Sequence, residues 1–158
     1  MSVRDYVFRC PNEIETAAAA WLLGLLRSQD LPQFAAIALS SGVDNEAVRT
    51  LAGLSDPGFD EAETLMKKTV AAVGLGSLDR RSAALILAKC IAALILNGQV
   101  AAYEGAKQIW DVAKLLDEAS FHDLDPFIYA ASEYEDRPND RSFFDDAIIN
   151  EARRLVAY

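Results

Sequence analysis

The longest apolar stretch of the chain runs from Ala83 to Leu96, fourteen residues interrupted by a single lysine. Ala84, Ala88 and Ala92 recur within it at steps of four, which places small side chains along one line of a helix. Leucine and isoleucine occupy most of the other positions, so such a helix would be buried on nearly all sides. We therefore expect a central hydrophobic helix over residues 78–97, around which the rest of the chain packs.

The remaining apolar residues also repeat at a helical period, and only Tyr6–Cys10 suggests a short extended segment. Glycine, proline and capping residues such as Asn12 mark the ends of the other expected helices. These span residues 12–28, 30–39, 44–51, 60–73, 100–118, 125–135 and 140–157. The chain has no linker, low-complexity tract or internal repeat. It is therefore predicted to be all-α, with residues 1–158 forming a single-domain bundle of about seven to eight helices.

Several large apolar side chains are assigned to the core from the helical period. The first expected helix should bury Trp21 and Leu22, and the last should turn both Phe143 and Phe144 inward.

Cys10 and Cys90 are the two cysteines, and two thiols are typical of a cytoplasmic protein. A disulfide between them is the alternative. The apolar run Ala17–Leu26 follows two acidic residues, whereas a signal peptide begins with positive charge. A membrane span needs about 20 apolar residues, more than any stretch here offers. We expect a cytoplasmic protein that does not bind membranes.

The net charge of −9 is confined to one part of the sequence. Between Asp111 and Glu151 there are twelve acidic and three basic residues, whereas the rest of the chain holds twelve of each. A field of one sign repels nucleic acid and attracts basic partners. Lysine and arginine occur only as isolated pairs beside acids, so nucleic-acid binding is not expected.

No motif of known catalytic chemistry is present. His122, the single histidine, lies in an expected interhelical loop and has no nucleophile near it in sequence. The chain lacks the Glu-x-x-His pairs of di-metal bundles and the acidic loop of an EF-hand, so no metal or other cofactor is expected. Gly74-Leu-Gly-Ser77 lacks the lysine and spacing of a phosphate-binding loop.

Aromatic and acidic residues alternate between Phe127 and Pro138, and the acids continue into the next expected helix. Tyrosine and carboxylates together can recognise a basic partner. The residues assigned to such a surface are Tyr129, Glu133, Glu135, Asp136, Asp140, Asp145 and Asp146. The alternative is an ordinary helix with one buried face and one solvated acidic face.

The segment Ala130-Ala-Ser-Glu-Tyr-Glu-Asp-Arg-Pro138 resembles the C-terminal part of small uncharacterised bacterial all-helical proteins, some of them immunity-like. This resemblance covers at most the last third of the chain. It implies a protein that binds and inhibits a toxin, and it assigns no site residue.

Together these observations predict a non-enzymatic cytoplasmic interaction protein of inhibitor or immunity type. Its acidic helices would cover a basic site on a protein partner, such as a toxin. A structural or assembly subunit that forms homo-oligomers through apolar surface is the alternative, and a metal-dependent hydrolase ranks last.

Overall fold

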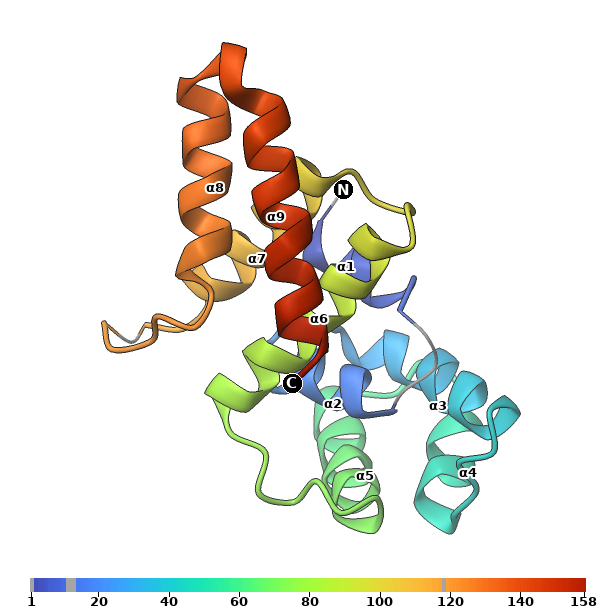
Figure 1. Cartoon of the computed structure of the whole chain (residues 1–158). Coiled ribbons are helices and arrows are strands. Elements are labelled where there is room, and N and C mark those ends of the chain that lie inside the picture. Colours follow the sequence, from blue (N-terminus) through green and yellow to red (C-terminus); the bar gives the residue numbers. More distant parts are fainter. Residues whose placement is uncertain (1, 11–13, 118) are drawn as a thin grey trace. The chain divides into compact units, whose positions relative to one another are not determined.

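A computed structural model describes residues 2–10, 14–117 and 119–158, and it is helical throughout (Figure 1). About 71% of the chain is helix and the described residues contain no strand, which confirms the all-α prediction. The helices are α1 (Val3–Val7), α2 (Ile14–Leu22), α3 (Leu31–Ser40), α4 (Glu46–Ala52), α5 (Phe59–Ala72), α6 (Arg80–Leu96), α7 (Ala102–Lys114), α8 (Asp125–Asp136) and α9 (Arg141–Val156). Two short 3₁₀ helices, η1 (Ser28–Asp30) and η2 (Pro138–Asp140), precede α3 and α9.

The chain divides into two compact units, and the division falls inside α6. Unit 1 comprises Met1–Cys10 and Ala84–Tyr158, and unit 2 comprises Pro11–Ala83. Whether the whole chain behaves as one domain stays a prediction.

Unit 1 is built on contacts among α7, α8 and α9, with α1 packed on α7. α8 and α9 lie side by side as an antiparallel pair joined through η2 (Figure 1). Apolar side chains from all three helices are fully buried between them, among them Ile109, Phe127 and Ile148. The predicted acidic segment therefore lies on two helices that pack on each other.

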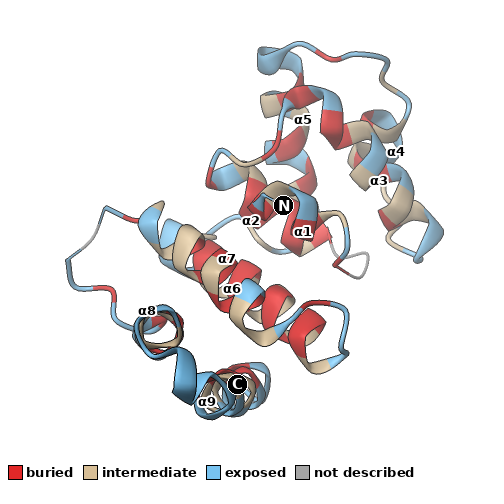
Figure 2. Ribbon diagram, turned by 90° about the horizontal axis from the view of Figure 1, so that it is seen from above, coloured by how far each residue is buried: buried red, intermediate tan, exposed pale blue. Residues whose placement is uncertain are grey.

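α6 has the expected hydrophobic character. Its alanine line, Ala84, Ala88 and Ala92, is fully buried, as are Leu87 and Ile91. Figure 2 shows red, buried stretches along α6 and also along α7. The helix begins at Arg80 rather than at residue 78.

Unit 2 is formed by α2 to α5. α3 packs on α4, α4 on α5, and α2 on both α3 and α5. Leu31, Val48, Leu51 and Met66 fill its core. Asp30, itself buried, accepts a hydrogen bond from the Arg27 backbone N–H at 2.9 Å, so its carboxylate is satisfied where α3 begins.

Three local predictions were wrong. Tyr6–Cys10 is not extended, because α1 includes Tyr6 and Val7 and a turn follows at Phe8 and Arg9. Ser2 and Asp5 cap the start of α1. The helix expected over residues 12–28 ends at Leu22. α5 begins at Phe59 after a Gly58 cap, one residue before the expected Asp60 cap. The Asn12 cap lies outside the described residues.

The early end of α2 has a backbone cause. Gly24 adopts φ +75°, a left-handed backbone conformation. This conformation is unfavourable for residues with a Cβ atom but is readily adopted by glycine. The Leu25 N–H then bonds the Ala20 carbonyl and the Gly24 N–H bonds the Trp21 carbonyl, which is a Schellman ending. The same pair of bonds ends α3, α5 and α6 at their own positive-φ glycines.

Gly105 lets α7 approach the end of α6 closely. A Cβ built on Gly105 would lie 2.5 Å from Ile95 Cγ1 and closer still to its Cδ1. Alanine normally stabilises a helix by about 1 kcal/mol relative to glycine. We expect Gly105→Ala instead to lower the free energy of unfolding by about 1–3 kcal/mol through overpacking, measured by urea denaturation.

Two variants check that cause. Gly76→Ala is the control, because nothing lies within 4 Å of its added Cβ. Adding Ile95→Val, which removes Cδ1, should restore part of the stability of Gly105→Ala. If the effects of Gly105→Ala and Ile95→Val on the free energy of unfolding simply add in the double variant, the two side chains do not clash.

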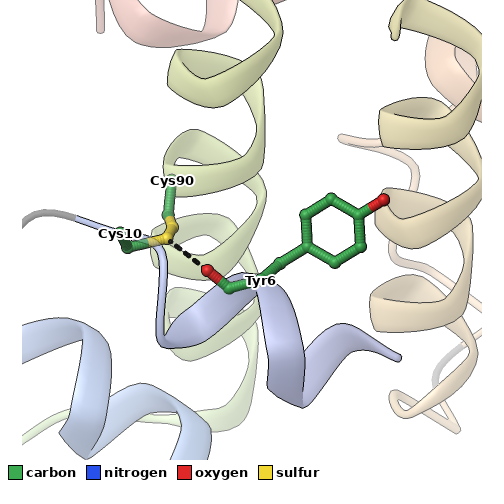
Figure 3. Close-up of a disulfide and its surroundings, with 3 residues drawn as sticks. All are labelled: Tyr6, Cys10 and Cys90. Carbon is green, nitrogen blue, oxygen red and sulfur yellow. Dashed lines mark hydrogen bonds between the residues drawn. A yellow bond between two sulfur atoms is a disulfide. The ribbon is translucent and has the colours of Figure 1, made fainter. Parts of the chain in front are cut away.

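Cys10 and Cys90 form a disulfide, in place of the two thiols expected from the sequence (Figure 3). The bond ties the segment after α1 to α6, and both residues belong to unit 1. Cys10 Sγ also lies 3.3 Å from the Tyr6 carbonyl oxygen. If the disulfide is reduced, this oxygen can accept a hydrogen bond from the Cys10 thiol. Spacing in sequence could not predict this pairing, since the two cysteines are 80 residues apart.

Candidate partner-binding surface

The seven residues assigned to a partner surface all lie in unit 1, on the α8–α9 pair. Tyr129, Glu133, Glu135 and Asp136 belong to α8, Asp140 ends η2, and Asp145 and Asp146 belong to α9. α8 and α9 pack directly on each other. The fold therefore gathers these residues on one helical pair.

Helical spacing arranges most of them in two lines. Tyr129, Glu133 and Asp136 are four and three residues apart along α8, so they share one side of that helix. At the start of α9, Asp140 and Asp146 stand three residues before and three residues after Phe143. Each line therefore combines one aromatic ring with two carboxylates.

Two of the six carboxylates among these residues are neutralised inside unit 1. Arg137 Nε lies 2.8 Å from Glu133 Oε2, and Lys107 Nζ lies 2.8 Å from Glu135 Oε1. Glu133 is also the less exposed of the two, with 21% of its side chain accessible. The Glu135 pair joins α7 to α8, whereas the Glu133 pair lies within the end of α8. Both carboxylates contribute little to an external field.

Glu135 is the centre of a network that joins α7 to α8. The Tyr103 hydroxyl donates to Glu135 Oε1 at 2.5 Å, and the Tyr103 ring stacks on Tyr134 with centroids 4.3 Å apart. The hydrogen bond to Glu135 raises the pKa of Tyr103 to about 12. Hydrogen bonds from Lys107 and Tyr103 lower the pKa of Glu135. Arg141 covers the Tyr134 ring at 4.9 Å. This network fixes α8 against α7.

The other four carboxylates form the acidic hairpin, a name used below for Asp136, Asp140, Asp145 and Asp146. Within the described part of the chain, none of the four has an ion pair with lysine, arginine or histidine. Arg141 acts on Asp145 only as a longer-range charge. Among the described residues, no direct ion pair therefore neutralises the four carboxylates of the acidic hairpin.

Burial and the charge of one neighbour disfavour the ionised form of Asp145. Burial, followed by the charge of Asp146, raises the pKa of Asp145 above its ordinary 3.8. The folded state therefore holds this proton more tightly than the unfolded state does. The protonated carboxyl group of Asp145 therefore contributes to the stability of the fold. This contribution is fully present below the pKa that Asp145 has in the unfolded chain, and it is lost as pH rises through the pKa that Asp145 has in the folded chain.

We therefore expect Asp145→Asn to be more stable than the unmodified chain at pH 7, by about 0.5 kcal/mol, and equal to it near pH 3. Thermal unfolding at several pH values measures the difference. Asp136→Asn, an exposed carboxylate on α8, serves as the control. A benefit that persists unchanged at pH 3 would contradict the role given to Asp145 ionisation.

Two aromatic rings project from the same helices into solvent. Tyr129 is 62% exposed and Phe143 is 69% exposed. The prediction that Phe143 faces the core was wrong, whereas Phe144 is buried as expected. The spacing of the apolar residues along α9 indicates this difference. The buried side chains recur at steps of four and three, at Phe144, Ile148, Ala152 and Leu155. Phe143 lies about 100° around the helix from that line.

Charge is distributed differently in the fold than along the sequence. Unit 1 has fourteen acidic and nine basic residues, which give it a net charge of −5. Unit 2 has ten acidic and six basic residues, which give it a net charge of −4. The segment from Asp111 to Glu151 is partly balanced by bases of unit 1 that lie outside it in sequence. The local feature that distinguishes unit 1 is therefore the acidic hairpin rather than its total charge.

The structure also describes His122 and the side chains that were considered as possible metal ligands. His122 Nδ1 lies 2.8 Å from Asp125 Oδ2 in the exposed loop before α8. Among the described residues, no three His, Cys, Asp or Glu side chains are grouped to hold a metal ion. In the same residues, no helix has both the length and the apolar character to cross a membrane.

In comparisons with known proteins, no protein family, curated protein or solved structure matches the chain.

Proposed function

We propose that this chain is a non-enzymatic interaction protein, of inhibitor or immunity type, that binds a basic protein. The observation that carries the proposal is the acidic hairpin, whose four carboxylates form no ion pair with any lysine, arginine or histidine that the structure describes. The exposed rings of Tyr129 and Phe143 belong to the same two helices. Aromatic anchors supply binding energy where water is excluded, and carboxylates around them steer a basic partner into place.

A toxin with a basic site for nucleic acid is the partner class that fits best. Such a site presents clustered lysine and arginine to phosphates, and an acidic hairpin offers them carboxylates instead. The resemblance of Ala130–Pro138 to immunity-like proteins points to the same class, as a resemblance only.

Self-association is the second candidate, because exposed rings such as Phe143 can also meet a second copy of the chain. Two acidic hairpins brought together would repel each other, which favours a basic partner over a homo-oligomer. Light scattering over a range of concentrations distinguishes the two, since growth in mass with concentration would favour assembly.

Affinity capture with two matched variants tests the proposal. The hairpin variant carries Asp136→Asn, Asp140→Asn, Asp145→Asn and Asp146→Asn. The control variant carries Glu46→Gln, Asp56→Asn, Asp60→Asn and Glu61→Gln, four exposed residues of unit 2. Both variants have a net charge of −5. We expect the unmodified chain and the control variant to capture the same basic protein, and the hairpin variant to lose it. Equal capture by all three would overturn the proposal.

The cytoplasm is our proposed compartment. Cytosolic reductants keep cysteines reduced, so the proposal requires Cys10 and Cys90 to be thiols in the cell, although they are close enough to pair. Alkylation of the protein at the moment of cell lysis measures this. A pair that is already oxidised would place the protein in an oxidising compartment.

A further inference from the structure

Unit 2 contains a cavity to which the acidic hairpin contributes no residue. The cavity has a volume of about 840 Å³ and lies between α2, α5 and the segment that leads into α6. All of its lining residues belong to unit 2. Sites for small organic ligands have volumes of about 300–1,000 Å³, so the cavity has the size of a small-molecule site.

The exposed apolar surface of unit 2 is concentrated at this cavity. Among the described residues of unit 2, the large hydrophobic side chains that are exposed are Leu22, at 38%, and Phe59, at 63%, and both line it. The sequence assigned Leu22 to the core, and that prediction was wrong. Trp21, which is half-buried, stacks on Phe59 with ring centroids 5.7 Å apart. The aliphatic residues of the lining include Leu22, Leu26, Met66, Val70, Leu75 and Leu78.

The three charged side chains of the lining already have partners within the protein. Lys67 Nζ lies 3.3 Å from Glu63 Oε1. Arg80 Nη1 donates to the Leu22 carbonyl oxygen at 3.3 Å, and Arg80 has a further interaction besides this bond. A charged guest would therefore lose its hydration without meeting an unpaired opposite charge, which is unfavourable. The net charge of −4 on unit 2 also repels an anion.

We propose that this cavity binds a small uncharged molecule with an apolar body. Such a guest would remove the exposed surface of Leu22 and Phe59 from water, which is favourable, and it needs no opposite charge in the lining. A partner helix is the competing occupant. Its diameter of about 10–12 Å requires a long open groove, whereas the lining here is confined to α2, α5, the first residue of α6 and two short connecting segments.

Binding of a fluorescent dye tests whether the cavity takes a guest. The probe is N-phenyl-1-naphthylamine, an uncharged aromatic dye whose emission increases in apolar surroundings. The chain has two tryptophans, so Trp110→Phe leaves Trp21 as the reporter on the protein. We expect saturable binding of the dye, with a change in Trp21 emission over the same range of dye concentration.

Displacement of the dye tests the charge of the guest. Decanol, decanoate and decylamine at pH 7 present one aliphatic chain with no charge, a negative charge and a positive charge. Each is used below the concentration at which it aggregates. Decanol should displace the dye at concentrations about tenfold or more below those of the two charged compounds, because burial of an unpaired charge is unfavourable.

Two alanines on α5 provide matched variants that locate the site. Ala71 and Ala72 are both exposed, but only Ala71 lines the cavity. Ala71→Phe fills part of the cavity and should weaken dye binding about tenfold or more, the effect of losing about two buried methylene groups. Ala72→Phe should bind the dye as the unmodified chain does. Circular dichroism checks that both variants are folded.

Three results would overturn the proposal: absence of saturable dye binding, equal dye binding by Ala71→Phe and Ala72→Phe, or displacement by a charged compound at the same concentration as by decanol. An apolar helical peptide that displaces the dye where decanol does not would also overturn it, and would identify a peptide groove instead.

Discussion

Replacing both disulfide cysteines, as Cys10→Ser with Cys90→Ser, is expected to cause the largest loss of stability of any change considered. The bond links residues 80 positions apart, and the loop that it closes includes all of unit 2. Closing a loop of that length restricts the unfolded chain and stabilises the fold by about 2–4 kcal/mol. For a chain of this size the melting temperature should fall by about 5–15 °C.

Thermal unfolding of oxidised protein, followed by circular dichroism, measures the effect. Reductant should lower the melting temperature of the unmodified chain toward that of the double variant, and should leave the variant unchanged. The same melting temperature with and without reductant would show that the bond contributes nothing to stability.

Removing the exposed rings, as Tyr129→Ala with Phe143→Ala, is expected to have the largest effect on partner binding. Anchors at the centre of an interface cost about 2 kcal/mol or more each when truncated, so affinity should fall by about 100-fold or more for the pair. Most of that loss should be faster dissociation. Interferometry with the captured partner measures both rates.

The matched control for the aromatic anchors is Tyr158→Ala, which removes an 85% exposed ring at the end of the chain. Because both anchors are mostly exposed, neither change should lower the melting temperature noticeably. Dissociation rates that stay unchanged would remove Tyr129 and Phe143 from the interface and leave electrostatics alone to explain binding.

The helical architecture could be predicted because local patterns determine it. The alanine line of α6 and the glycine that follows it in the sequence are local signals, and both were interpreted correctly. The end of α2 was missed at Gly24, since an apolar run on both sides of the glycine looked like continuing helix. Contacts between distant residues, such as Cys10 with Cys90, leave no comparable pattern in one sequence.

The candidate surface was predicted only in part, for a similar reason. Sequence places all seven residues near one another along the chain, and the helical pair keeps them together. It could not reveal that Lys107 of α7 neutralises Glu135, because that pair forms across two helices. Nor could it reveal the cavity of unit 2, whose walls come from three separate segments.

The association rate of the captured partner, measured against salt concentration, tests the central claim most directly. Steering by a charged surface raises association rates about 10-fold or more at low salt, and ions screen it. The unmodified chain and the unit 2 control variant should associate fast and slow down as salt is added. The hairpin variant should associate slowly at every salt concentration. If the hairpin variant matches the control variant in rate and in salt dependence, the acidic hairpin is not the surface that receives the partner.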